Sequence, residues 1–241
     1  MRSRRPLPDD RVAVVTGGGR GIGANIARAL AGDGWSVVVT ARTQSEIDAV
    51  ADETGGRAVQ MDVTSRDSVE RGFDEIGHVD LLVANAGGGN YDDWWRTFEV
   101  NVLGVHLSCD AALARGCSRI VVIGSGAAYL PGASETAYTS SKAAVCRYAE
   151  TLNNELGGRV PVFLVSPGRV RTALTIGHFP EDDGKWTPPE CAPALVLKLV
   201  SGRYDALAGR YLHAEASDVD DLLARIDEVR ERDLQAIRLR Y

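Results

Sequence analysis

Short apolar runs rich in valine and isoleucine recur along this chain, and helical patterns separate them. The runs occupy residues 11–16, 35–41, 58–61, 79–84, 118–124 and 160–165. The stretches between them carry Ala, Leu, Arg and Glu at helical spacing, as at 22–31, 45–53, 65–76 and 137–156. Continuous apolar runs are typical of parallel strands that are buried on both faces. The alternation therefore predicts an α/β fold, a doubly wound parallel sheet of about seven strands flanked by helices.

The length and charge of the chain narrow its organisation and its partners. With 241 residues, we expect residues 1–241 to form a single domain around one core. A net charge of -6 argues against a nucleic-acid surface, which needs clustered Lys and Arg. No apolar run reaches the roughly 18 residues that span a bilayer, and Pro8, Asp9 and Asp10 follow the basic start where a signal peptide is apolar. We expect a cytoplasmic protein with a small-molecule partner.

Cysteine and histidine are dispersed along the chain without paired short spacing. This pattern predicts neither a disulfide framework nor a metal site. The residues concerned are Cys109, Cys117, Cys146, Cys191, His78, His106, His178 and His213.

Two C-terminal stretches stand apart from the strand and helix alternation. Residues 172–189 are irregular and contain an acidic trio, Trp186 and three prolines. A loop of this length inside a domain is functional or disordered, and we expect it to contact the substrate. Residues 217–241 alternate acidic and basic side chains around spaced apolar residues, which predicts one solvated amphipathic tail helix.

A glycine-rich turn lies between the first predicted strand and the first predicted helix. Glycines permit a sharp turn there and let a pyrophosphate approach the backbone, while the helix N-terminus offers free N–H groups. Glycine turns often serve only geometry, so the prediction rests on this placement. The spacing G-x-x-x-G-x-G also differs from the fingerprint G-x-G-x-x-G. The expected cofactor contacts are Gly17, Gly19, Arg20, Gly21, Ile22 and Gly23.

The end of the second predicted strand bears on the choice of cofactor. An acidic side chain there would bind the 2′-hydroxyl of NAD, but the chain has Ala41 followed by Arg42. Arg42 and Arg20 can instead bind a 2′-phosphate through charge-assisted hydrogen bonds. The alternative is that both are ordinary surface arginines. We therefore predict that NADP(H) is favoured over NAD(H).

Tyr138 and Lys142 lie four residues apart in a segment of helical character. On a helix they share one face. A lysine ammonium beside a tyrosine favours the phenolate, so we expect Lys142 to lower the pKa of Tyr138 and make it a proton donor and acceptor. In isolation this spacing more often reflects a packed tyrosine and a solvated lysine, so the other motifs must decide.

Further motifs follow the predicted strands in order. Asp62 and Val63 follow the third strand, Asn85, Ala86 and Gly87 the fourth, and Ser125 the fifth; Asn101 lies in a helix, and Pro167, Gly168, Val170 and Thr172 follow the sixth strand. Together with the glycine turn and the Tyr138–Lys142 pair, these motifs resemble the short-chain dehydrogenase/reductase family over residues 11 to about 212. The resemblance implies a Rossmann-like fold, a bound nicotinamide cofactor and the reaction type of an NADPH-dependent ketoreductase.

The resemblance also implies roles for these residues. Tyr138 gives its proton to the developing alkoxide, Ser125 orients the substrate oxygen, and Lys142 holds the nicotinamide ribose. Asn101 holds a water that links Lys142 to solvent, although by itself it reads as a structural amide. Asp62, Val63, the Asn85 to Gly87 motif and the Pro167 to Thr172 segment contact the cofactor. By its chemistry alone, Asp62 could equally lie next to the N-cap of a helix. Asn85 could equally be a structural residue that steadies the loops after the central strands.

The substrate is less constrained by the sequence. Segments 88–95, 126–134 and 172–189 follow the strand ends and carry the aromatic residues Tyr91, Trp94, Trp95, Tyr129, Phe179 and Trp186. They suggest a small apolar, aromatic or polyketide-like carbonyl compound, with Trp95 packing in its helix. The alternatives are an NAD-dependent alcohol dehydrogenase, a 3-oxoacyl reductase, an epimerase or dehydratase, or a nucleotide-sensing protein.

Related proteins form dimers and tetramers, and the sequence offers faces for such pairing. The Ala- and Leu-rich faces of 137–156 and 101–113 can pair across a two-fold axis, which predicts a homodimer or homotetramer. Residues 209–215 depart from the family's usual Gly-Gly turn, which puts the usual C-terminal contacts in doubt.

Overall fold

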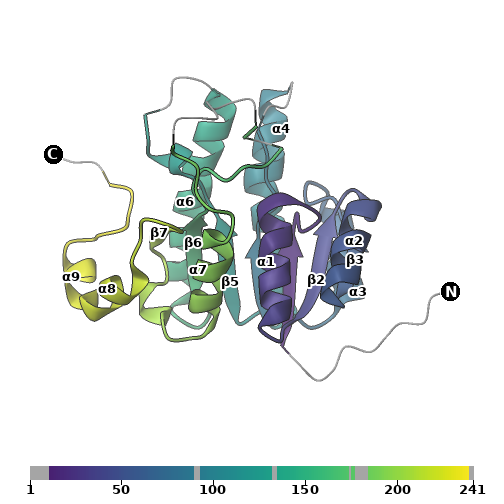
Figure 1. The fold of residues 1–241 in the computed structure, drawn as a ribbon, viewed down its shortest axis with the longest axis horizontal. Coiled ribbons are helices and arrows are strands. Elements are labelled where there is room, and N and C mark those ends of the chain that lie inside the picture. Colours follow the sequence, from purple (N-terminus) through teal and green to yellow (C-terminus); the bar gives the residue numbers. More distant parts are fainter. Residues whose placement is uncertain (1–10, 90–92, 132–134, 174, 177–183, 239–241) are drawn as a thin grey trace.

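The computed structural model describes residues 11–89, 93–131, 135–173, 175–176 and 184–238. Seven parallel strands form one sheet in the order β3-β2-β1-β4-β5-β6-β7, which confirms the predicted doubly wound α/β fold (Figure 1). The chain starts at the centre of the sheet, winds to one edge and returns to build the other half. The strands are β1 Val12–Thr16, β2 Ser36–Ala41, β3 Arg57–Gln60, β4 Leu81–Ala84, β5 Arg119–Ile123, β6 Val162–Ser166 and β7 Tyr211–His213.

Helices cover both faces of the sheet, as its continuous apolar strands require. On one face α1 Gly21–Gly32, α2 Gln44–Thr54 and α7 Cys191–Val200 bury their apolar side chains; on the other lie α3 Arg66–Ile76, α5 Gly104–Leu113 and α6 Thr136–Leu156. A short helix α4 Trp94–Phe98 runs through a π-helical turn Glu99–Leu103 into α5. Within the described residues, no helix is both long enough and apolar enough to cross a membrane.

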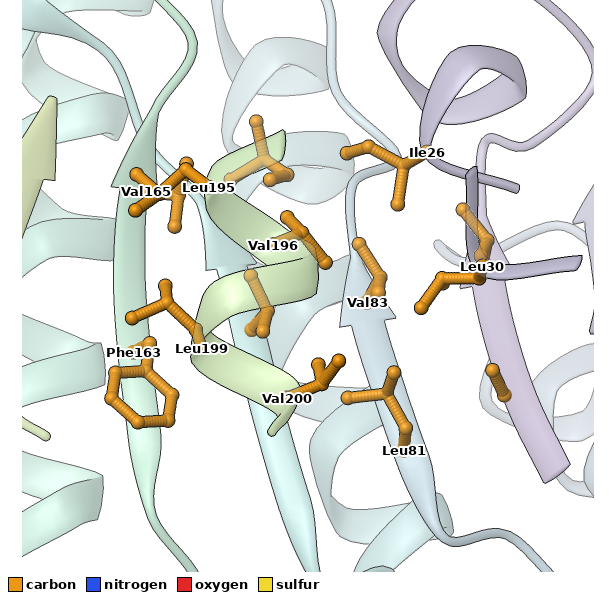
Figure 2. Packing of buried hydrophobic residues seen from close by; sticks show 14 of the residues in the cluster. Ile26, Leu30, Leu81, Val83, Phe163, Val165, Leu195, Val196, Leu199 and Val200 are labelled. Atoms are coloured by element: carbon orange, nitrogen blue, oxygen red, sulfur yellow. The ribbon is translucent and has the colours of Figure 1, made fainter. Parts of the chain in front are cut away.

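The core on the first face is built around α7. Leu195, Val196 and Leu199 of this helix contact side chains of β4, β6 and α1, including Val83 and Phe163 (Figure 2). Leu199 and Phe163 are completely buried. Truncation of a buried leucine to alanine typically costs about 2–5 kcal/mol, so the packing of this helix contributes strongly to the stability of the fold.

The predicted single tail helix is wrong. Residues 217–238 form two short helices, α8 Val219–Ala224 and α9 Ile226–Glu231, separated at Arg225. They lie at the β7 end of the sheet (Figure 1), and Leu222 and Val229 are buried in the core rather than solvated.

The end of the tail is set by the edge of the sheet. After α9 the chain turns through positive φ angles at Asp233 and Gln235. The carbonyl oxygen of Gln235 then accepts a hydrogen bond from the backbone N–H of Tyr211 in β7 at 2.8 Å. An edge strand presents unpaired donors, and satisfying this one competes with continuation of the helix.

Candidate active site

A cleft of about 680 Å³ opens along the carboxyl ends of the strands. In open α/β sheets ligands bind at this edge, where the strand order reverses, and here the reversal lies between β1 and β4. Sixteen of the predicted residues line the cleft: Gly17, Gly19, Arg20, Gly21, Ile22, Gly23, Arg42, Asp62, Val63, Asn85, Ala86, Gly87, Tyr138, Lys142, Pro167 and Thr172.

The other predicted site residues lie close to the cleft without lining it. Asn101 is completely buried, and Ser125 is half-buried directly after β5. Val170 is 3% exposed, and its side chain packs in the interior. Gly168 has a φ of 78°, a backbone conformation that favours glycine.

The glycine turn between β1 and α1 requires glycine at specific positions. Gly17 and Gly21 have φ angles of 64° and 56°, which L side chains rarely adopt. A Cβ on Gly23 would lie 2.4 Å from the carbonyl oxygen of Gly17 and 2.4 Å from Asn85 Nδ2. At the N-terminus of α1 the Arg20 side chain makes no capping hydrogen bond, so the first N–H groups of the helix remain available to an anion.

Asn85 locks the glycine turn in place. Its Nδ2 donates to the carbonyl oxygens of Thr16 at 2.9 Å and Gly17 at 3.1 Å. The hydroxyl oxygen of Thr16 accepts hydrogen bonds from the backbone N–H groups of Asn85 and Ala86, each at 3.1 Å. These contacts fit the steadying role that its chemistry alone suggested.

Charged residues gather around Asp62, which lines the cleft. Asp62 accepts hydrogen bonds from the backbone N–H and the hydroxyl of Thr64, and its carboxylate lies 3.6 Å from Arg96. Burial raises the pKa of Asp62, but these hydrogen bonds and the cations Arg96 and Arg42 more than offset it, so the pKa lies below its usual value. Asp62 is therefore a carboxylate at neutral pH.

The structure corrects the expected effect of Lys142 on Tyr138. Lys142 is 5% exposed, and its Nζ donates to the carbonyl oxygen of Ile123 at 3.1 Å and lies 5.8 Å from the centre of the Tyr138 ring. Burial raises the pKa of Tyr138, and a hydrogen bond with Ser125 only partly opposes this rise. Burial also lowers the pKa of Lys142 to about 8. Desolvation thus pushes both groups toward their neutral forms.

Asn101 ties the π-helical turn to the strand loops. Its Oδ1 accepts from the N–H of Gly88 at 2.9 Å, while its Nδ2 donates to the carbonyl oxygen of Gly88 and to Ser141 Oγ, both at 2.9 Å. A Cβ on Gly87 would lie 3.3 Å from both Asn101 Oδ1 and Lys142 Nζ. Both amide protons of Asn101 are committed to protein groups, as the structural interpretation expects.

The segment after β6 is clasped by a residue that sequence reasoning missed. A Cβ on Gly168 would lie 2.1 Å from Thr187 Oγ1, and the N–H of Thr187 donates to the carbonyl oxygen of Arg169 at 2.8 Å. The buried hydroxyl of Thr187 donates to Glu215 after β7 at 3.0 Å. Part of the predicted substrate loop 172–189, including Phe179, lies outside the described residues.

Trp95 is not packed inside its helix, contrary to expectation. It is 59% exposed, and its ring stacks on Phe98 at 5.6 Å between centroids. Trp94 is 45% exposed, and its Nε1 donates to Thr136 Oγ1 at 3.1 Å, next to the start of α6. Tyr91 lies outside the described residues.

Several cleft residues had no signal in the sequence. Glu46, Thr43, Met61, Val100 and Arg171 all line it. Glu46 lies in the first turn of α2. The spacing of residues in the sequence does not predict that this helix packs on the glycine turn. The described residues contain no group of three or more His, Cys, Asp or Glu side chains that could hold a metal ion.

Comparison with known proteins finds relatives of this chain. A family model for short chain dehydrogenases matches residues 11–183. An uncharacterized oxidoreductase of Staphylococcus aureus strain USA300 is 30% identical over 215 residues, which cover 81% of this chain and 93% of that protein.

Solved structures resemble the whole fold. RhlG of Pseudomonas aeruginosa, in an active-site complex with NADP, has a TM-score of 0.76 and 29% identity and covers 84% of this chain and 94% of its own. BdcA in complex with NADPH has a TM-score of 0.77 and 30% identity, and the match covers 84% of this chain and 91% of the BdcA chain.

Proposed function

The chain belongs to the short-chain dehydrogenase family and is an NAD(P)-dependent oxidoreductase, and from this premise we propose that it reduces the ketone of a small apolar or aromatic compound with NADPH. The observation that carries the proposal is the grouping of Ser125, Tyr138 and Lys142 beside a cleft whose other end is a glycine turn. The same residues serve the reverse oxidation of a secondary alcohol.

The cleft fits a dinucleotide. The glycine turn packs so closely on α1 that a Cβ at Gly23 would collide with the carbonyl oxygen of Gly17, and the start of α1 leaves N–H groups for a pyrophosphate. Asp62 and Val63 line the adenine end, and Pro167 and Thr172 line the nicotinamide end. When bound, the reduced cofactor supplies hydride to the carbonyl carbon.

Tyr138 is the proposed proton donor to the carbonyl oxygen. Its raised pKa keeps the phenol protonated at neutral pH, which is the form that an acid in the reducing direction needs. Ser125 forms a hydrogen bond with this phenol and orients the same substrate oxygen.

Lys142 is the proposed ribose-binding residue and the next member of the proton path. A pKa of about 8 lets it hold a proton at neutral pH and release it readily. Asn101 holds the π-helical turn and Ser141 in place around Lys142. Because its side-chain donors are committed, any water that it holds must bind its Oδ1 or its backbone carbonyl.

The preference for NADPH rests on the two arginines at the adenosine end. Arg42 and Arg20 line the cleft beside Ala41, where no carboxylate follows β2 directly. Within the described residues Arg42 makes no ion pair, so its charge is available to a 2′-phosphate. That RhlG and BdcA were solved with NADP and NADPH supports the same preference.

An apolar substrate is favoured by the surface around the cleft. Five of the six large hydrophobic residues that are exposed follow the carboxyl ends of β4, β5 and β6: Trp94, Trp95, Tyr129, Leu130 and Ile176. Exposed apolar side chains that gather at one edge mark a binding surface. This count concerns the described parts of the chain only.

We also propose that the enzyme pairs with a second copy through α5 and α6. Leu103 of the preceding turn is 39% exposed, and the rings of His106 in α5 and Tyr148 in α6 make a T-shaped contact with their centroids 5.9 Å apart. The β7 edge of the sheet is covered by the C-terminal segment of the same chain, because the N–H of Tyr211 donates to the carbonyl oxygen of Gln235. A dimer therefore fits better than a tetramer that pairs β7 edges.

The substitution Tyr138→Phe tests the proposed reaction. It removes the donated proton, so we expect kcat with a panel of ketones to fall at least ~100-fold while NADPH binding stays within about threefold. Oxidation of NADPH is followed at the nicotinamide absorbance, and binding by fluorescence titration. Tyr204→Phe is the control, because Tyr204 lies outside both the cleft and the proposed pairing face, where its hydroxyl donates to Asp220 at 2.7 Å.

Two results would redirect the proposal. If Tyr138→Phe turned over at the wild-type rate, Tyr138 would not be the acid. If the wild-type protein bound NADPH but oxidised it with no ketone in the panel, an epimerase, dehydratase or nucleotide-sensing function would replace ketone reduction.

A further inference from the structure

An acidic side chain stands among the cations that are proposed to bind the 2′-phosphate. Glu46, in the first turn of α2, lines the same end of the cleft as Arg20 and Arg42. Its Oε1 lies 3.4 Å from Arg20 Nη1, within hydrogen-bond and ion-pair distance. One of the two arginines is therefore paired with a carboxylate of the chain itself.

The position of Glu46 is fixed by packing. A Cβ on Gly19 would lie 2.9 Å from Glu46 Cβ, so the first turn of α2 rests directly on the glycine turn. The next residue, Ile47, is completely buried and anchors that turn in the core. The side chain of Glu46 is 34% exposed, whereas that of Arg20 is 72% exposed. Arg20 is the more exposed side chain of the pair and has more room to move.

This arrangement opposes a phosphate more than it opposes a hydroxyl. A 2′-phosphate carries up to two negative charges and takes Arg20 as a partner, so it competes with Glu46 for the guanidinium. The 2′-hydroxyl of NAD needs no cation, and Arg20 can stay where it is. The Arg20–Glu46 pair therefore weakens the binding of NADP(H) and leaves the binding of NAD(H) unchanged.

We propose that Glu46 is a cofactor-specificity residue that latches Arg20 and limits the preference for NADPH over NADH. The inference rests on the proposed NADPH preference and adds the residue that sets its size. Glu46 acts through Arg20, so its effect should disappear when Arg20 is removed. This dependence separates a latch from simple repulsion between Glu46 and the phosphate.

The substitution Glu46→Gln tests the latch, and the chain supplies a matched control. Glu53 lies on the same helix and pairs with Arg28 of α1 at 2.6 Å, so it too bridges α1 and α2, but neither residue lines the cleft. We expect Glu46→Gln to lower the Kd of NADPH about three- to fivefold, the size of one exposed ion pair, and to leave the Kd of NADH within twofold. Glu53→Gln should change neither constant.

The Arg20→Gln background completes the test. If the gain in NADPH affinity from Glu46→Gln vanishes there, the latch is supported; if the gain persists, Glu46 repels the phosphate directly and the latch is overturned. A wild-type protein that prefers NADPH, with an unchanged Glu46→Gln variant, also overturns it while the proposed function stands. A wild-type protein that binds NADH at least as tightly as NADPH instead overturns the proposed cofactor preference on which the latch rests.

Discussion

Replacing Lys142 by methionine should stabilise the unliganded protein while removing its activity. Lys142 is 5% exposed, and burial lowers its pKa from 10.5 to about 8. One pKa unit corresponds to about 1.4 kcal/mol, so holding this ammonium in the folded chain costs about 3 kcal/mol at pH 7. Methionine is similar in length, flexible and uncharged, so it should fill the space without that penalty.

The hydrogen bond of Lys142 reduces the expected gain. Its Nζ donates to the carbonyl oxygen of Ile123 at 3.1 Å, and losing such a bond costs about 1 kcal/mol. The net gain is then about 2 kcal/mol at pH 7, or an increase in Tm of about 4–8 °C for a chain of this size. Activity should be lost, because methionine can neither hold the ribose nor carry a proton.

The pH dependence of the gain identifies its cause. Between pH 8 and pH 10.5 the unfolded chain keeps a proton on this lysine that the folded chain has released, so wild-type stability rises with pH across that window. The advantage of Lys142→Met should therefore shrink to about zero by about pH 10.

Urea unfolding of the wild type and of Lys142→Met at pH 7 and near pH 10 measures the stability gain at each pH. Lys198→Met is the control, because Lys198 is half-exposed and pairs with Asp220 at 2.8 Å, and the hydrogen bond with Asp220 raises its pKa. That control should lose stability at pH 7. A Lys142→Met variant that is less stable than wild type at pH 7, or equally stabilised at both pH values, would refute the reasoning.

Three other substitutions test the fold around the site. Gly23→Ala places a Cβ 2.4 Å from the carbonyl oxygen of Gly17, so we expect at least tenfold weaker NADPH binding by fluorescence titration. Unchanged binding would mean that the turn does not need glycine at this position to bind the cofactor. Asn101→Ala removes three buried hydrogen bonds and should cost about 2–4 kcal/mol in urea unfolding, whereas a loss below about 1 kcal/mol would mean that water replaces them. Asp218→Ala removes the cap of α8, which accepts from two N–H groups at 3.0 and 3.1 Å, and should cost about 1 kcal/mol with kcat unchanged.

The fold was predictable because its strands are buried on both faces. A run such as Val162–Ser166 is buried at every position, so its composition reports its environment directly. The tail was not predictable by the same reasoning. Its periodicity is that of a helix over its whole length, but its course depends on the unpaired N–H of Tyr211, which exists only once β7 lies at the sheet edge.

The positions of the site residues were predictable, but their electrostatics were not. Strand ends and glycine spacing predict which residues gather at the carboxyl edge, and sixteen of the predicted positions line the cleft. Glu46 was missed because its place follows from how α2 packs on Gly19, a contact between helix and turn that has no sequence period.

The pair Tyr138 and Lys142 shows why a motif does not fix a pKa. Spacing places the two side chains on one helical face, which suggests a charged lysine that draws the phenol toward ionisation. The fold instead buries Lys142 against the carbonyl oxygen of Ile123, where desolvation acts on the ammonium and the phenol alike. A protonated phenol is the form that delivers a proton to a developing alkoxide, and Tyr138 keeps its proton at neutral pH. Alcohol oxidation needs the phenolate, and at this buried position the phenolate carries the cost of desolvation.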